Sequence, residues 1–429
     1  MEKRVLETDK NYTLVEYTLE GREVEIAENR AARRLNDIVE IPGFRKGRVP
    51  KSVLKLRFGE AFKDYVLEEL EKKVVSEEEE LLERSLLTPI VVESELEDGK
   101  TTVKVEWHLE PEVEIDDYEG IELKKVEKEE LVEKYVQKRL EDLREEHALL
   151  EEKEEKAEYG DQVKVRMVVT TEEGKVLRDE EYEYVLVEED DRPFVKDLVG
   201  KKKGDVVEFD REYKGHKFHY KLELLGVYRR ILRELDDEFA KAVSREFETL
   251  EQLKEKLKEE GEDSYDATMK QILRDQALEW LVEHTQLEIS EKTLQRVLED
   301  MTRRLKEEGK YEKLVEDFGG EEELKKATQD RFLRNLKETY GIRKVAEKEG
   351  IEVTEEELER EAEELAALWG INPRKAKALV KNDPRIREDL EWTLLKNKVL
   401  DAIVSKAKVV VLSEEEFRKE FGGGEDEEG

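Results

Sequence analysis

The chain has 429 residues, which favours two to four domains over a single core. Its net charge is −36, with 45% charged and 37% hydrophobic residues, a composition typical of charge-laced helices around several modest cores. It has no cysteine, which excludes disulfides, thiolate zinc sites and cysteine nucleophiles. No stretch has the pattern of a signal peptide or a membrane span, so we expect a cytoplasmic protein without membrane contact.

Residues 1–112 predict an α+β domain. Alternating apolar residues indicate a strand over residues 12–19, and an amphipathic helix is expected over residues 22–39. Two more helices are expected over residues 51–58 and 60–85. The strands 90–96 and 101–109, joined by a turn, close the domain.

Residues 113–154 are interpreted as a linker followed by a long charged helix, residues 128–152. The pattern then changes to short alternating strands separated by turn residues, which predicts a small antiparallel β domain over residues 155–228. Its expected strands cover residues 163–170, 182–187, 206–213 and 217–228.

Residues 229–421 predict an extended, all-α domain. Ser290 marks one helix start, and Thr354 with Glu357 has the spacing of a capping box. The acidic, glycine-rich end at residues 422–429 is expected to be a disordered tail. The expected helices cover residues 236–244, 249–260, 265–286, 291–307, 311–318, 321–349, 355–368, 373–380 and 384–405.

One window, residues 41–59, stands out by its charge: it has six Lys or Arg and no Asp or Glu. Its first part, residues 41–50 (IPGFRKGRVP), combines glycines and prolines with one aromatic residue, which is turn chemistry. We call residues 41–59 the basic window and residues 41–50 the basic loop. Cations attract phosphate and an exposed Phe44 can stack or insert, so the loop is expected to bind RNA or a protein–RNA surface. The alternative is that Phe44 and Val49 fold back into the core.

The helix before this loop carries Arg30, Arg33 and Arg34 on its polar side. The positive patch is therefore expected to extend from the loop onto this helix.

The stretch GFRKGRVP, residues 43–50, closely resembles the ribosome-docking signature of trigger factor, a bacterial chaperone family that acts at the nascent-chain exit. Segments similar to later parts of that family follow in order at residues 111–122, 234–253, 340–356 and 396–410. The resemblance thus spans the whole chain. It implies a ribosome-docking domain, an FKBP-like domain and a helical chaperone domain.

By this resemblance, the basic loop would bind the large ribosomal subunit beside the exit tunnel, both a ribosomal protein and nearby ribosomal RNA. Phe44, Arg45 and Lys46 would make the contacts, Gly43 and Gly47 would shape the loop, and Arg48 belongs to the same ribosome-binding motif.

The β domain occupies the place of the family's FKBP-like prolyl isomerase. Lowering the rotation barrier of about 18–20 kcal/mol requires an apolar, aromatic-lined pocket and no nucleophile. The resemblance implies that Tyr184, Phe194 and Tyr220 line such a pocket. The alternative is that these three aromatic residues are only the core of a small barrel.

Several residues depart from the isomerase pattern. Arg166 and Met167 replace an acidic–aromatic motif on the first strand, and polar Asp190, Asp191 and Arg192 replace an apolar pair. The flap between the last strands is reduced to residues 211–215. We therefore predict weak or lost isomerase activity, with a functional FKBP-type isomerase as the alternative main role.

No nucleotide-binding motif is present, so we expect no cofactor and an ATP-independent mechanism. His216 and His219 are interpreted as surface residues on a strand, and no metal site is expected. The thin apolar stripes of the helices predict an open cradle for nascent and unfolded polypeptides. Exposed apolar surface of this kind also permits a homodimer of the free protein. A purely structural helical scaffold is the remaining alternative.

Overall fold

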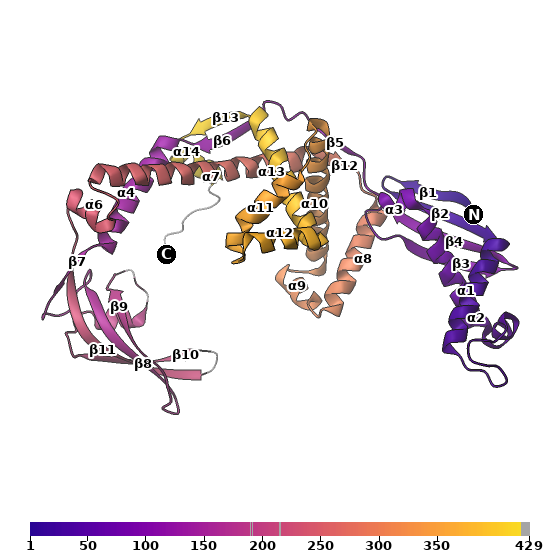
Figure 1. Ribbon diagram of the computed structural model, residues 1–429, viewed down its shortest axis with the longest axis horizontal. Coiled ribbons are helices and arrows are strands. Elements are labelled where there is room, and N and C mark those ends of the chain that lie inside the picture. Colours follow the sequence, from indigo (N-terminus) through magenta and orange to yellow (C-terminus); the bar gives the residue numbers. More distant parts are fainter. Residues whose placement is uncertain (189, 191, 214–215, 422–429) are drawn as a thin grey trace. The chain divides into compact units, whose positions relative to one another are not determined.

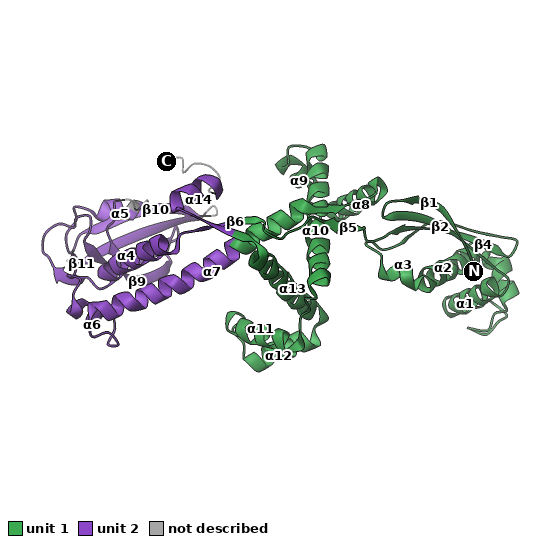
Figure 2. Ribbon diagram, turned by 90° about the horizontal axis from the view of Figure 1, so that it is seen from above, with its two compact units in different colours: residues 1–123, 273–408 green, residues 124–272, 409–429 purple. Residues whose placement is uncertain are grey.

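The computed structural model describes residues 1–188, 190, 192–213 and 216–421; the predicted tail lies outside these residues. The chain forms two compact units, coloured separately in Figure 2. Unit 1 comprises residues 1–123 and 273–408, and unit 2 comprises residues 124–272 and 409–429. No helix among the described residues is both long enough and apolar enough to cross a membrane.

Unit 1 begins with a four-stranded antiparallel sheet in the order β1-β2-β4-β3. Its strands are β1 (Glu2–Asp9), β2 (Tyr12–Glu20), β3 (Ile90–Glu97) and β4 (Lys100–His108). Three helices accompany it: α1 (Arg22–Ile38), α2 (Lys51–Glu77) and α3 (Glu79–Glu83) (Figure 1). The sequence did not predict β1, because every side chain of this edge strand is exposed and no apolar alternation marks it.

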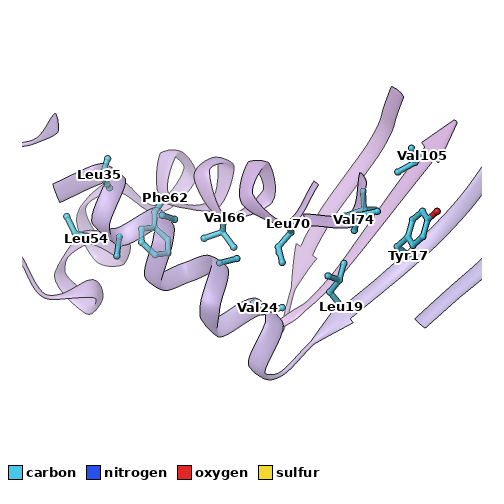
Figure 3. Close-up of a cluster of buried hydrophobic side chains, with 14 of the residues drawn as sticks. Tyr17, Leu19, Val24, Leu35, Leu54, Phe62, Val66, Leu70, Val74 and Val105 are labelled. Carbon is cyan, nitrogen blue, oxygen red and sulfur yellow. The ribbon is translucent and has the colours of Figure 1, made fainter. Parts of the chain in front are cut away.

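The core of this α+β part lies between the sheet and the helices α1 and α2 (Figure 3). Tyr17 and Leu19 point from β2 into it, as period-two alternation requires. In α2 the buried residues Phe62, Val66, Leu70 and Val74 recur every four positions and form one stripe. The two helices predicted over residues 51–85 form a single α2 with non-helical backbone at Phe58, followed by α3.

The rest of unit 1 is mainly helical. One core joins Leu281, Ile342, Val399 and Ile403, and a smaller one joins the last three helices. Its complete elements are β5 (Val113–Ile115), β12 (Thr285–Leu287), α8 (Glu291–Glu307), α9 (Tyr311–Asp317), α10 (Glu321–Glu349), α11 (Glu355–Leu368), α12 (Pro373–Asn382) and α13 (Pro384–Lys406). Strands β5 and β12 pair with each other.

Both predicted caps are confirmed. The Ser290 hydroxyl accepts a hydrogen bond from the Lys292 N–H at the start of α8. Thr354 and Glu357 form the reciprocal capping box of α11.

Unit 2 contains a five-stranded antiparallel sheet in the order β10-β11-β8-β9, with β7 paired to β11. Its strands are β7 (Leu149–Glu152), β8 (Gln162–Thr171), β9 (Val176–Val185), β10 (Val206–Tyr213) and β11 (His216–Ile231). Its complete helices are α4 (Lys128–Glu146), α5 (Pro193–Leu198), α6 (Asp237–Val243) and α14 (Glu414–Phe421). Helix α7 (Leu250–His284) and the paired strands β6 (Glu122–Val126) and β13 (Lys408–Leu412) have residues in both units.

Two helix predictions in this part of the chain were wrong. The helix expected to reach residue 152 ends at Glu146, because the next residues pair with the end of β11 and satisfy their backbone groups as β7. The predicted break near Gly261 is absent, and α7 runs straight through it. A Cβ atom at Gly261 would lie 2.9 Å from Cδ1 of Tyr135, so this glycine permits close packing of α7 on α4.

Candidate functional site

The basic loop joins α1 to α2 through two tight turns. The N–H of Phe44 donates to the Ile41 carbonyl at 3.1 Å, and the N–H of Arg48 donates to the Arg45 carbonyl at 2.9 Å. Gly43 has φ +93° and Gly47 has φ +76°. A side chain strains such a backbone, so both glycines suit the turns that display the residues between them.

Asn36 of α1 anchors the end of the loop. Its buried side chain donates to the Val49 carbonyl at 3.0 Å and accepts from the Val49 N–H at 2.9 Å. Ile41 and Val49 are buried in the core beside it, whereas Phe44 is 41% exposed. The alternative of an inward-folded loop is thus right for Val49 and wrong for Phe44, which stays at the surface.

The six cations of the basic window differ in how far they are already neutralised. Lys46 lies 3.1 Å from Glu40, and Lys51 and Lys55 both bind Glu28. Burial alone would raise the pKa of Glu28, but hydrogen bonds from these two lysines outweigh it and lower that pKa. The remaining cations of the window, Arg45, Arg48 and Arg57, are exposed and have no ion-pair partner among the described residues.

The predicted extension of the positive patch onto α1 is corrected for two of its three arginines, which form ion pairs with α2. Arg30 lies 3.7 Å from Glu69 and Arg34 lies 2.6 Å from Glu68. Arg34 also lies over the ring of Tyr65, at 4.7 Å from its centroid. Arg33, the third predicted arginine, is exposed and has no ion-pair partner among the described residues, so of the three only this position extends the patch onto α1.

Leu56 was missed by the sequence analysis. It lies in the first turns of α2 and is 90% exposed, more than any other large apolar side chain among the described residues. No spacing rule marks such a residue, because the stripe of buried residues only shows which positions face the core.

The aromatic residues predicted in the β domain lie in one row. Tyr184 packs on Phe194 at 5.2 Å between centroids, Phe194 stacks on Phe209 at 6.1 Å, and Phe209 stacks on Tyr220 at 5.0 Å. Phe209 was missed, since it lies in β10 and no resemblance pointed to it. A cavity of about 510 Å³ opens beside Phe194, Phe209, Tyr220 and Met167.

The rim of this cavity is charged. Arg192 lies over the rings of Tyr184 and Phe194, at 5.1 and 5.3 Å from their centroids. It also binds Asp190, and these hydrogen bonds lower the pKa of that carboxyl to about 2. Asp210 and Arg211 complete the rim, while Asp191, Lys214 and Gly215 lie outside the described residues. The cavity thus combines an aromatic wall with fixed charges at its mouth.

No group of three or more potential metal ligands occurs among the described residues. His219 instead places Nδ1 2.8 Å from Oδ1 of Asp210 on the neighbouring strand β10.

Within unit 1, a buried polar cluster joins the α+β sheet to the start of α8. The Asn11 side chain donates to the Leu109 carbonyl at 2.9 Å and accepts from the Ser290 N–H at 2.8 Å. Thr293 donates to the same Asn11 oxygen and lies 2.9 Å from Nδ1 of His108. The other ring nitrogen of His108 is buried without a hydrogen-bond partner. Burial therefore lowers the pKa of His108, although Glu106 and Asp300 act in the opposite direction.

This cluster predicts acid sensitivity. Because His108 binds a proton less readily in the folded chain, the unfolded chain binds more protons around and below the ordinary histidine pKa of 6.5, and stability falls as the pH drops through this range. The thermal midpoint of the wild type should thus fall further between about pH 7.5 and about pH 5.5 than that of His108→Gln. Equal falls in the two proteins would show that His108 does not control this loss.

Comparison with known proteins gives a consistent result along the chain. The family model for bacterial trigger factor protein matches residues 1–143, and the model for its C-terminus matches residues 249–405. Trigger factor from Thermotoga maritima is 51% identical, over 100% of this chain and 99% of the relative. The relative from Kosmotoga olearia is 43% identical, over 97% of this chain and 95% of its own length.

A solved structure from work on promiscuous substrate recognition by the trigger factor chaperone has a TM-score of 0.78 and 52% identity. It matches 94% of this chain and 99% of that chain. With full-length relatives at this identity and a matching fold, the chain belongs to the trigger factor family.

Proposed function

We propose that this ribosome-associated chaperone docks beside the exit tunnel of the large ribosomal subunit through its basic loop. The observation that carries the proposal is the combination of an anchored loop with an exposed Phe44 and free guanidinium groups at Arg45 and Arg48. Ribosomal RNA attracts the guanidinium groups, and an apolar pocket of a ribosomal protein suits the aromatic ring. The chain as a whole is strongly acidic and is repelled by RNA, which favours attachment at this basic loop.

Replacing Phe44, Arg45 and Lys46 by alanine is expected to abolish co-sedimentation with ribosomes while the far-UV circular dichroism stays unchanged. The three side chains are exposed, so their loss removes contacts to a partner and leaves the core intact. A matched control, Leu82→Ala with Arg84→Ala and Lys72→Ala, removes one exposed apolar residue and two exposed cations from the same α+β part. Undiminished binding of the loop variant, or an equal loss in the control, would refute docking through the loop.

We also propose that the mainly helical part of unit 1 shelters nascent or unfolded polypeptides without ATP. Leu368, Trp369 and Phe318 are exposed apolar side chains on this part, and such side chains suit many weak contacts with unfolded chains. The expected result is that the full chain, without nucleotide, suppresses aggregation of a chemically denatured test protein. Aggregation at the rate seen in buffer would favour the alternative of a structural scaffold.

We propose domain boundaries at residues 112, 154, 228 and 421. The first core is built from buried residues between Val15 and Trp107, and the core of the β domain from buried residues between Ala157 and Val227. A cytoplasmic location of the protein, where it can reach ribosomes, fits this function. Exposed apolar residues would equally permit the free protein to form a homodimer.

Weak prolyl isomerase activity is a second candidate function, and the aromatic wall of the cavity beside Phe194 favours it. The charged rim keeps water in that cavity, which opposes transfer of an X–Pro bond into an apolar site. In a protease-coupled peptide assay, the full chain is expected to be little faster than buffer. The double variant Asp190→Leu with Arg192→Leu should be faster, because it replaces the charged rim with apolar side chains.

A fast wild-type rate that Phe194→Ala removes would instead support a working isomerase as the main role. If neither the wild type nor the double variant is faster than buffer, the aromatic row serves only as the core of the β domain.

A further inference from the structure

A second basic segment lies in the helical part of unit 1, over residues 371–387 (INPRKAKALVKNDPRIR). It contains six Lys or Arg and a single acid, Asp383, in a chain of net charge −36. The segment comprises α12 and the start of α13. The segment is therefore a local exception to the acidic character of the chain.

Three of these cations are held by carboxylates. Lys377 lies 3.0 Å from Glu359 and 2.9 Å from Glu363 of α11, which fixes α12 against that helix. Arg387 and Arg385 make ion pairs as well, with Glu355 at 2.6 Å and Asp383 at 3.6 Å.

The other three cations, Arg374, Lys375 and Lys381, are exposed and form no ion pair within 4 Å among the described residues, although the charge of Lys381 contributes to lowering the pKa of Glu355. Ala376 and Val380 are buried on the side of α12 that packs on α11. At 3.6 residues per turn, all three cations lie about 120–140° around α12 from the buried side, Arg374 and Lys381 on one flank and Lys375 on the other. Free positive charge therefore covers the outward face of α12.

Exposed apolar side chains lie next to these cations. Leu368, at the end of α11, is 79% exposed, and Trp369 follows it immediately. Leu379 of α12 is exposed too, one turn from Lys375. Leu379 thus shares one flank of α12 with Lys375, and Leu368 and Trp369 precede the cations of α12 by only a few residues in the chain.

We propose that this face binds acidic, apolar-containing segments of unfolded polypeptides. The proposal rests on the proposed chaperone function, and names a class of client for it. Most of this chain's surface repels carboxylates, so a client segment rich in Asp or Glu needs a local patch of opposite charge. The three free cations supply that patch, while Leu368, Trp369 and Leu379 contact the apolar residues of the same segment.

The surroundings favour a short peptide segment over RNA. Helix α11 carries seven glutamates along its length, directly beside α12. RNA carries a negative charge on every nucleotide, so the part of it beyond the three cations would be repelled by these carboxylates. A peptide with only a few acidic residues can place them at the cations and avoid this repulsion. An acidic polypeptide is therefore the partner that matches both the charge and the apolar side chains.

The test uses the full chain and two labelled, unstructured peptides with the same apolar residues, one with glutamate and one with lysine between them. The charge reversals Arg374→Glu, Lys375→Glu and Lys381→Glu are expected to weaken binding of the acidic peptide at least about tenfold in fluorescence anisotropy. Binding of the lysine peptide should stay unchanged or strengthen. The control Lys313→Glu, Lys326→Glu and Arg331→Glu alters three exposed helical cations of unit 1 and changes the net charge equally.

An unchanged affinity of the acidic peptide in the first variant, or an equal loss in the control, would overturn the proposal. Tighter binding of a short single-stranded RNA than of the acidic peptide, lost in the first variant, would overturn the assignment to polypeptide. Suppression of aggregation of a neutral apolar client should survive the reversals. If the wild type does not suppress this aggregation either, the chaperone proposal itself fails.

Discussion

Replacing Asn36 by leucine is expected to loosen the basic loop and to weaken ribosome binding, although no charged or aromatic side chain is removed. The substitution leaves the buried N–H and carbonyl of Val49 without partners. Each of the two groups costs about 1–3 kcal/mol, so the local free energy of opening should fall by about 2–6 kcal/mol. Amide hydrogen exchange in peptides from α1 and α2 measures this fall directly.

Asn335→Leu is the matched control for this prediction. It makes the same substitution at an exposed position of α10, where no buried backbone group depends on the side chain. The control should leave hydrogen exchange in α1 and α2 and ribosome binding unchanged. If Asn36→Leu behaves like the control, the loop is held by something other than its contact with Val49.

Two leucines of α2 provide the second large expected effect. Leu70 is fully buried between the helices and the sheet, as Figure 3 shows, whereas Leu56 on the same helix is 90% exposed. Leu70→Ala should destabilise the α+β part by about 2–5 kcal/mol, because it removes buried apolar contacts and leaves a cavity. Leu56→Ala should change stability by less than about 0.5 kcal/mol.

Hydrogen exchange in the strands β2 and β4 measures the stability of this core in both variants, since these strands carry Tyr17 and Val105 of the same core. Faster exchange in Leu70→Ala alone is the expected outcome. Similar exchange in the two variants would mean that the stripe of buried residues along α2 does not hold this core together.

Much of the helical architecture could be predicted from the sequence, because a helix that buries one face has apolar residues at regular three- and four-residue spacing. The stripe of Phe62, Val66, Leu70 and Val74 predicted its helix, and the caps at Ser290 and Thr354 marked two helix starts. Elements without such regular apolar spacing were not predicted. Strand β1 is exposed along its whole length and is fixed by its backbone pairing to β2.

Gly261 shows a different limit. Glycine usually ends a helix, and the prediction followed that rule. Here the residue lies inside α7, where the ring of Tyr135 from α4 takes the space of its missing side chain. Only the tertiary packing distinguishes these two uses of the same residue type.

The candidate site was likewise only partly predictable from the sequence. The charge of the basic window was visible in the sequence, but the pairing of Lys51 and Lys55 with Glu28 was not, because that carboxylate lies on the preceding helix. Phe209 joined the aromatic row of the β domain only through the pairing of β10 with β11, which puts it opposite Tyr220. Contacts between distant positions thus decided which charges stay free and which rings meet.

Phe44 at the tip of the basic loop is the side chain that we propose touches the ribosome. The most direct test is a photoreactive phenylalanine derivative at position 44, with the same derivative at exposed Leu82 as the control. Irradiation with ribosomes should attach the chain to a component of the large subunit from position 44 and leave position 82 unattached. No attachment from position 44 under conditions where the chain co-sediments with ribosomes, or equal attachment from both positions, would show that Phe44 does not make this contact.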